Sequence, residues 1–364
     1  MKKSALLLFT FVFFISCNTT DTATQQKINK ANAVAEQFLI DQQIPGMAIS
    51  ISQKGKMIWS KGFGYADVAA KKKVNPSTTQ FRVASISKTL TALAMAKLVE
   101  EEKLDLSTSL YAYVPDFPKK KYDFTVKQLG GHVAGIRHYD YTNNEKELFN
   151  IKKMSIVEGL DIFKNDSLLF KPGSKYSYST YGWNLLSVVV QNAAKTDFNE
   201  YMVSTVFNPL RMKNTTLGLV DKKMPNRTAF YIREIGIEDG KVILGPKVSN
   251  EYKAAGGGFI STTEDLILFG KEIISPTIIS KNTLTEFVTS QETDNGKKTN
   301  YGIGFGVTNV KNNTLRYSHS GGGIGATAFL LVYPEKELVI TILTNLAQVK
   351  IRDLVSSLED VFIE

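Results

Sequence analysis

The chain has 364 residues, a hydrophobic fraction of 43% and a charged fraction of 22%. These values are ordinary for one large globular domain or two smaller ones, and they exclude collagen-like, coiled-coil and disordered chains. The formal net charge of +9 includes short lysine runs that have no interleaved aromatic residues and no nucleic-acid motif. We therefore expect solvated loops at these runs and no nucleic-acid partner.

The first residues are typical of an export signal. Two lysines precede an apolar run from Ala5 to Ile15, which is too short to span a bilayer as a mature helix. Cys17, the only cysteine, follows a small residue, as in a bacterial lipoprotein signal. We expect residues 1–16 to be the signal peptide and residues 17–26 a lipidated tether at the bacterial cell envelope. The alternative is a plain secretory signal with an incidental cysteine.

Hydrophobic periodicity predicts the first elements of the folded domain. Apolar residues recur at helical spacing over 27–43. The alternation over 47–53 and 57–65, on either side of a glycine-containing turn, predicts a β-hairpin.

The pattern is mostly helical from Phe81 to about residue 215, and it alternates again after residue 300. The predicted helices are 87–101, 155–163, 180–194, 198–206 and 265–274, the last with a capping box from Ser261 to Glu264. The predicted closing elements are strands at 301–310, 314–320, 326–333 and 337–344 and a helix at 352–362.

Strands thus come from both ends of the chain, with helices between them. We expect an α+β fold, in which an antiparallel β-sheet is flanked by the terminal helices and a mostly helical region is inserted. The domain would cover residues 27–364, with the sheet region at about 27–75 and 300–364 and the helical region at about 76–299. A functional site is expected in the cleft between the two regions.

Ser85 and Lys88 are the first candidates for catalysis. They stand three residues apart where a helix begins, so both side chains face the same way. Helix N-termini carry free N–H groups and a positive potential that favour a developing oxyanion. The pair is either a nucleophile with its proton acceptor or an N-cap serine beside a surface lysine.

Other catalytic arrangements find little support. The three histidines, His132, His138 and His319, lack the spacing and the acidic partners of a zinc site, so we expect no metal and no other cofactor. No Gly-x-Ser-x-Gly segment opens a helix, which argues against an α/β-hydrolase triad. If Ser85 is a nucleophile, its base is Lys88, a tyrosine or a histidine.

Two further segments carry groups that suit chemistry. Tyr178 lies in an aromatic, hydroxyl-rich loop before a predicted helix, and a neighbouring ammonium would lower the phenol pKa from about 10. Glycines follow His319 at the end of a predicted strand, where backbone N–H groups can approach a substrate closely. Each segment is otherwise an ordinary loop corner or hairpin turn.

In this order the segments resemble the serine β-lactamase-related family, which includes class C β-lactamases, DD-peptidases and some esterases. The resemblance runs along nearly the whole mature chain. The segments that carry it are 44–47, 61–67, 85–88, 129–136, 172–173, 178–180, 256–262 and 319–321.

The chain departs from class C β-lactamases at two positions. Thr180 stands where those enzymes have the Asn of Tyr-x-Asn, and His319 stands where they have the Lys of Lys-Thr-Gly. The segments 135–139, 178–180 and 319–321 instead resemble the mitochondrial serine β-lactamase-like proteins, which are peptidase-like. This resemblance argues against efficient β-lactam hydrolysis.

The resemblance also implies residue roles. Ser85 is implied as the acylated nucleophile, and Lys88 and Tyr178 share its proton, with either one as the general base. His319 is implied to orient or bind a carboxylate or leaving group, and backbone N–H groups of Ser85 and Gly322 to form the oxyanion hole. The implied substrate-binding and oxyanion residues are His319, Gly321, Gly322 and Thr180.

We therefore expect a serine hydrolase with an acyl-enzyme on Ser85, peptidase- or esterase-like, acting on a cell-envelope or other small amide or ester substrate. One alternative is a β-lactamase of class C type. Another is a catalytically idle module that binds peptidoglycan or a partner. The expected partners are a peptide, ester or β-lactam substrate and the membrane, contacted through a lipid on Cys17; the oligomeric state is left open.

Overall fold

The computed structural model describes residues 22–142, 147–234 and 240–363. The predicted signal peptide at 1–16 and the lipidation site Cys17 lie outside the described residues. No helix in the described ranges is long and apolar enough to cross a membrane.

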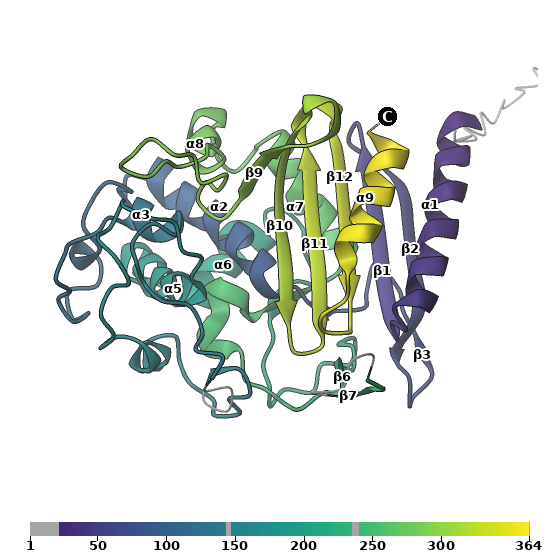
Figure 1. The fold of residues 1–364 in the computed structure, drawn as a ribbon, viewed down its shortest axis with the longest axis horizontal. Coiled ribbons are helices and arrows are strands. Elements are labelled where there is room, and N and C mark those ends of the chain that lie inside the picture. Colours follow the sequence, from purple (N-terminus) through teal and green to yellow (C-terminus); the bar gives the residue numbers. More distant parts are fainter. Residues whose placement is uncertain (1–21, 143–146, 235–239, 364) are drawn as a thin grey trace, which may run out of the picture.

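A seven-stranded antiparallel sheet forms one half of the molecule (Figure 1). Its strand order is β3-β2-β1-β12-β11-β10-β9. The strands are β1 (Gly46–Gln53), β2 (Lys56–Asp67), β3 (Lys72–Lys73), β9 (Gly306–Asn309), β10 (Leu315–Gly323), β11 (Ala326–Tyr333) and β12 (Leu338–Thr344). The pairing of β1 with β12 runs from Met47 opposite Thr344 to Gln53 opposite Leu338, so the two ends of the chain meet in the sheet.

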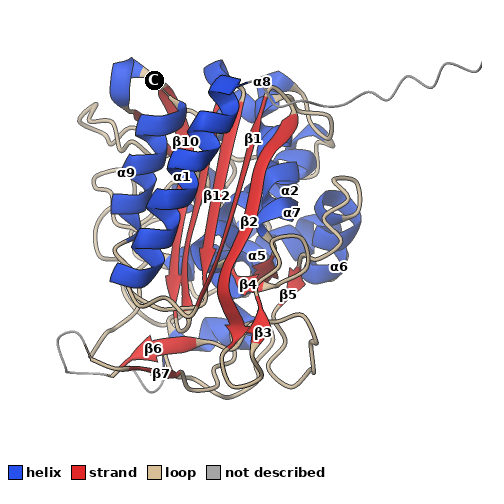
Figure 2. Ribbon diagram, turned by 90° about the vertical axis from the view of Figure 1, so that its right-hand side faces the viewer, coloured by secondary structure: helices blue, strands red, loops and turns tan. Residues whose placement is uncertain are grey.

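Both faces of the sheet are covered, which explains why β1 is buried along nearly its whole length. Helices α1 (Thr22–Asp41) and α9 (Ile351–Phe362) lie side by side on one face (Figure 2). Ala35 and Leu358 belong to the apolar cluster on this side. Helix α7 (Thr263–Ile274) packs on the other face and joins the sheet to the helical region.

The helical region supplies most of the larger apolar cluster. Its α-helices are α2 (Ser87–Glu100), α3 (Val126–Gly130), α5 (Thr180–Ala194), α6 (Phe198–Met202) and α8 (Lys281–Phe287). Short 3₁₀ or π turns lie at Ala84–Ile86, Leu110–Ala112, Glu158–Ile162, Val203–Phe207, Glu251–Lys253, Ala254–Gly258, Lys311–Asn313 and Pro334–Lys336.

Five short strands form two further small sheets. Strands β4, β8 and β5 form one sheet, and β6 pairs with β7 in the other. Their bounds are β4 (Phe81–Arg82), β5 (Thr216–Leu217), β6 (Tyr231–Arg233), β7 (Val242–Leu244) and β8 (Phe259–Ser261). Strand β4 leads directly into the turn that carries Ser85.

The antiparallel sheet, the terminal helices and the helical insertion are confirmed, but several boundaries differ. Helix α1 begins at Thr22, so it includes the last residues of the predicted tether. The predicted helix 155–163 is only a 3₁₀ turn, where a Cβ on Gly159 would lie 2.8 Å from Tyr252. The predicted helix 198–206 divides into α6 and a π turn.

Two further expectations were wrong in detail. The predicted strand 301–310 shrinks to β9, because Gly304 has a φ of +82° in a turn where an added Cβ would lie 2.8 Å from Ala92 Cβ. The cap of α7 is Thr262 rather than Ser261, since its side chain accepts a hydrogen bond from the Asp265 N–H at 3.1 Å.

Candidate active site

Ser85 lies in the Ala84–Ile86 turn, between β4 and α2. The preceding residue, Ala84, has a φ of +45°, a strained conformation for a residue with a Cβ. This conformation makes a sharp turn that presents Ser85 to the adjoining cavity. Lys88 follows in the first turn of α2, and its Nζ lies 3.1 Å from the Ser85 Oγ.

Lys88 is fully buried, and no acidic side chain of the described residues contacts it. Its Nζ lies 2.6 Å from the Gly256 carbonyl oxygen and 3.3 Å from the Thr180 Oγ1. Burial, helped by the positive charge of Lys253, holds the Lys88 pKa well below its usual range. A neutral amine has two N–H groups for Gly256 and Thr180, and its lone pair is then left for the Ser85 hydroxyl.

Gly256 makes this close approach feasible. A Cβ at this position would lie 2.7 Å from Thr180 Cγ2 and 2.9 Å from Asn184 Oδ1, both on α5. Any side chain would therefore push the Ala254–Gly258 turn away from α5 and move the carbonyl oxygen that binds Lys88.

Tyr178 lies just before α5, and its ring centroid is 5.0 Å from Lys88 Nζ. The phenol interacts with the hydroxyls of Ser85 and Thr180, but burial outweighs both interactions and raises the Tyr178 pKa above its ordinary value. The expectation that a neighbouring ammonium lowers this pKa was wrong, because burial of the phenol outweighs the interactions that lower it.

His319 is buried, and both of its ring nitrogens are occupied within the protein. The Nδ1 lies 2.6 Å from the Ser320 carbonyl oxygen, which only accepts, so we assign the proton to Nδ1. The Nε2 then accepts from the Tyr301 hydroxyl at 2.9 Å. Burial lowers the His319 pKa to about 3, so the ring is neutral at pH 7. His319 lines a second cavity together with Tyr178.

Gly321 and Gly322 differ in their surroundings. A Cβ on Gly321 would lie 2.3 Å from the Val83 carbonyl oxygen, so this glycine allows β10 to pack against the segment before Ser85. A Cβ on Gly322 would meet no atom within 4 Å, and Gly322 lines the cavity next to Ser85. Among the predicted substrate-binding residues, Gly322 and Thr180 thus share a cavity with Ser85.

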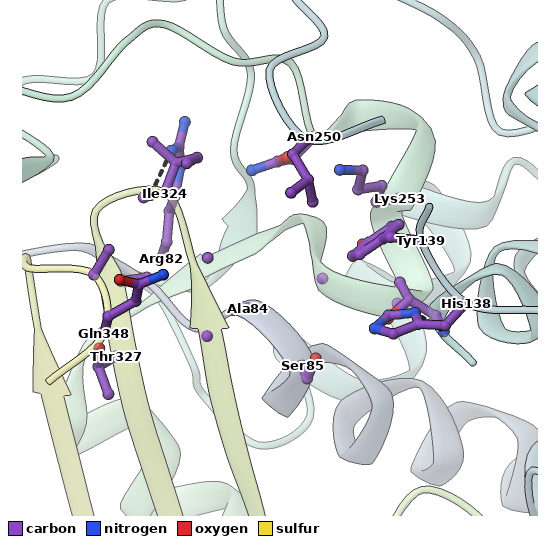
Figure 3. Close-up of a pocket in the computed structure, with 18 of the residues that line it drawn as sticks. Arg82, Ala84, Ser85, His138, Tyr139, Asn250, Lys253, Ile324, Thr327 and Gln348 are labelled. Carbon is purple, nitrogen blue, oxygen red and sulfur yellow. Dashed lines mark hydrogen bonds between the residues drawn. The ribbon is translucent and has the colours of Figure 1, made fainter. Parts of the chain in front are cut away.

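This cavity has a volume of about 400 Å³ (Figure 3). Sequence reasoning missed four of its polar side chains: Arg82, Tyr139, Asn250 and Lys253. His138, which the sequence offered as a metal ligand or as one of the possible bases, also lines it, and its Nδ1 accepts from the Thr180 N–H at 3.1 Å. One signal was available: Lys253 is a charged residue directly before the small residues 254–258.

An antiparallel sheet with both terminal helices on one face, a helical insertion and a buried lysine beside a serine define the class of β-lactamases and penicillin-binding proteins. The chain belongs to the Beta-lactamase family, whose model matches residues 31–354.

Individual relatives agree with this membership. The chain is 32% identical to the human mitochondrial serine beta-lactamase-like protein LACTB, over 80% of this chain and 69% of that protein. It is 28% identical to protein flp of Staphylococcus aureus strain MW2, over 89% of this chain and 63% of that protein. Among solved structures, the octameric penicillin-binding protein homologue from Pyrococcus abyssi has a TM-score of 0.76 at 25% identity, covering 88% of this chain and 74% of that one.

Proposed function

We propose that the protein is a serine hydrolase that acts on a peptide, amide or ester carbonyl through an acyl-enzyme on Ser85. One observation carries the proposal: a buried Lys88, whose pKa lies well below its usual range, stands 3.1 Å from the Ser85 Oγ with no acidic partner among the described residues. A lysine placed only for solubility would lie at the surface and keep its charge. The family membership supports the same chemistry.

The mechanism follows from this arrangement. Lys88 takes the Ser85 proton while the Oγ forms a bond to the carbonyl carbon. Backbone N–H groups of Ser85 and Gly322 stabilise the oxyanion, and losing one such donor typically costs about 3–4 kcal/mol. Tyr178, which keeps its proton because its pKa is raised, donates that proton to the leaving group as the carbon–leaving-group bond breaks, and it is reprotonated from Lys88.

Deacylation reverses these proton transfers. A water molecule attacks the acyl carbon and gives its proton to Lys88, and the bond to Ser85 Oγ breaks as the serine regains its hydrogen. His319 has no free nitrogen for a substrate, so we assign it a positioning role on Tyr301. Its neutral ring also supplies no fixed positive charge for a β-lactam carboxylate. This favours peptidase or esterase activity over class C β-lactamase activity.

Labelling with a fluorophosphonate tests the proposal directly. Intact-mass analysis is expected to find one adduct on the parent protein and none on Ser85→Ala, which removes only one oxygen atom. An adduct of equal yield on both proteins would refute Ser85 as the nucleophile. An unlabelled parent would favour the binding-module alternative, and nitrocefin turnover by the parent would revive the β-lactamase alternative.

We also propose that the protein is anchored to the bacterial cell envelope by a lipid on Cys17, on the sequence pattern alone. Radiolabelled palmitate fed to expressing bacteria is expected to enter the parent protein and not Cys17→Ser. Equal labelling of both would contradict the anchor.

A further inference from the structure

The cavity beside Ser85 is charged in an unusual way. Two basic side chains, Arg82 and Lys253, contribute to its lining, and no Asp or Glu of the described residues does. In Figure 3, Lys253 and Asn250 lie on one side of the cavity, Arg82 on the other, and Ser85 below them. Lys253 is buried, and Arg82 is partly buried.

Arg82 and Lys253 differ in their hydrogen-bond partners. Arg82 donates to the carbonyl oxygens of Ile324 and Val248 and stacks on Phe230, with 3.9 Å from its guanidinium carbon to the ring centroid. These contacts fix the position of the Arg82 side chain, so we assign it a structural role. Lys253 donates to one backbone oxygen within the described residues, that of Glu147 at 2.9 Å.

No acidic side chain of the described residues forms an ion pair with Lys253, and the charge of Glu147 acts on it only from a longer distance. The carboxylate of Glu147 instead forms an ion pair with Arg137 and accepts hydrogen bonds from the Tyr181 hydroxyl and the Asp140 N–H. Tyr139 lies under the Lys253 ammonium at 4.7 Å from the ring centroid. A buried ammonium without a carboxylate partner is costly, and an anion that enters the cavity removes that cost.

The positions of the two cavities indicate which part of a substrate enters here. Tyr178, the proposed proton donor to the leaving group, lines the second cavity with His319. Ser85 and Lys253 line the first cavity. The leaving group therefore departs on the Tyr178 side, and the acyl group stays bonded to Ser85 in the cavity that contains Lys253.

We propose that this cavity is a subsite for an acyl group that carries a carboxylate, and that Lys253 binds that carboxylate. The inference rests on the proposed acyl-enzyme at Ser85 and adds the charge of the substrate to it. Burial lowers the Lys253 pKa to about 7, so an entering carboxylate also draws a proton onto the amine near neutral pH.

Pairs of substrates that differ only in charge test the subsite. The first pair is the thiobenzyl esters of N-acetyl aspartate and N-acetyl asparagine, and the second is those of N-acetyl glutamate and N-acetyl glutamine. Each ester is supplied as the L- and the D-enantiomer. The kcat/KM ratio of acid to amide is measured for the purified protein. We expect a ratio of at least about 10 for one pair, which corresponds to one charge-assisted hydrogen bond of about 1.4 kcal/mol.

Variants assign the preference to Lys253. Lys253→Met, which removes the charge at similar length, is expected to reduce the ratio to 1 or below. Lys247→Met, at an exposed lysine outside the cavity, is expected to keep the parent ratio. A ratio that persists in Lys253→Met would overturn the assignment, and circular dichroism confirms that each variant is folded.

Measurements on the parent protein alone also distinguish a failure of the anionic subsite from a failure of the proposed nucleophile. If Ser85 takes the fluorophosphonate but the protein separates acid from amide by less than about twofold, or hydrolyses neither thioester, the anionic subsite is refuted and the nucleophile stands. If Ser85 takes no label and no thioester is hydrolysed, the proposed function fails first.

Discussion

The protonation state of Lys88 links the stability of the protein to its chemistry. An unfolded lysine has a pKa of about 10.4, whereas burial holds the pKa of Lys88 well below that value in the folded protein. Between the two values, folding must release a proton. The unfolded state then binds more protons than the folded state, so the free energy of unfolding rises with pH in that window.

A substitution tests the free-energy cost of removing the proton from Lys88 on folding. Lys88→Met fills similar volume without a titrating group and is expected to raise the Tm at pH 7 by a few degrees, on the scale of about 1 kcal/mol. The gain should shrink as the pH approaches about 10, where unfolded lysine also loses its proton. Thermal unfolding at pH 6, 7, 8 and 10 checks this trend, and a Tm gain that grows with pH would contradict a lowered Lys88 pKa.

Tyr178 offers a second test at the residue scale. Tyr178→Phe keeps the ring that packs beside Lys88 and removes the hydroxyl that reaches Ser85. Acylation is expected to slow by about 100-fold, the usual scale of general acid–base assistance. Stopped-flow measurement of the acylation phase distinguishes this from slower deacylation, and an unchanged acylation rate would remove Tyr178 from the proton path.

Sequence reasoning found the residues whose neighbours in the chain form a motif, and it missed those placed by the fold. Ser85 and Lys88 share one helical turn, so their proximity is local. Lys253 lies 165 positions after Lys88 and still affects its pKa, because a turn of small residues packs against α2. The pKa direction of Tyr178 was also missed, since burial depends on the whole fold.

At the scale of elements, the approach between the Ala254–Gly258 turn and α5 controls the site. Gly256→Ala is expected to lower stability by about 1–3 kcal/mol and to reduce activity, because the methyl group would overlap Thr180 and Asn184. Gly322→Ala is the matched control, since its Cβ meets no atom within 4 Å. Urea unfolding should separate the two variants, and equal stabilities would contradict tight packing at Gly256.

Elements with strong periodicity were predicted well. The bounds of α5 and β11 match the predicted ranges 180–194 and 326–333. The failures at 155–163 and 301–310 share a cause, because each segment contains at least one glycine whose packing against distant residues decides the local conformation. Periodicity reports which face of an element is buried, but it does not report how closely two backbones approach.

At the scale of the whole molecule, the terminal helices seal one face of the sheet together. Ala35 of α1 and Leu358 of α9 lie in the same buried cluster. Leu358→Ala is expected to destabilise the protein by about 2–5 kcal/mol, because the residue is fully buried. Rates of Ser85 labelling in the folded protein should stay unchanged, since Leu358 lines neither of the two cavities at the site. A labelling rate that falls in proportion to stability would contradict this separation.

The pairing of β1 with β12 has a consequence for biosynthesis. Ser50 lies opposite Thr341 in the centre of the sheet, with 291 positions of chain between them. A ribosome must therefore complete almost the entire polypeptide before the central strands can pair. The emerging chain stays open during translation, with its first strand unpaired on one side, and such an open chain is the form that a translocation channel accepts and that chaperones bind.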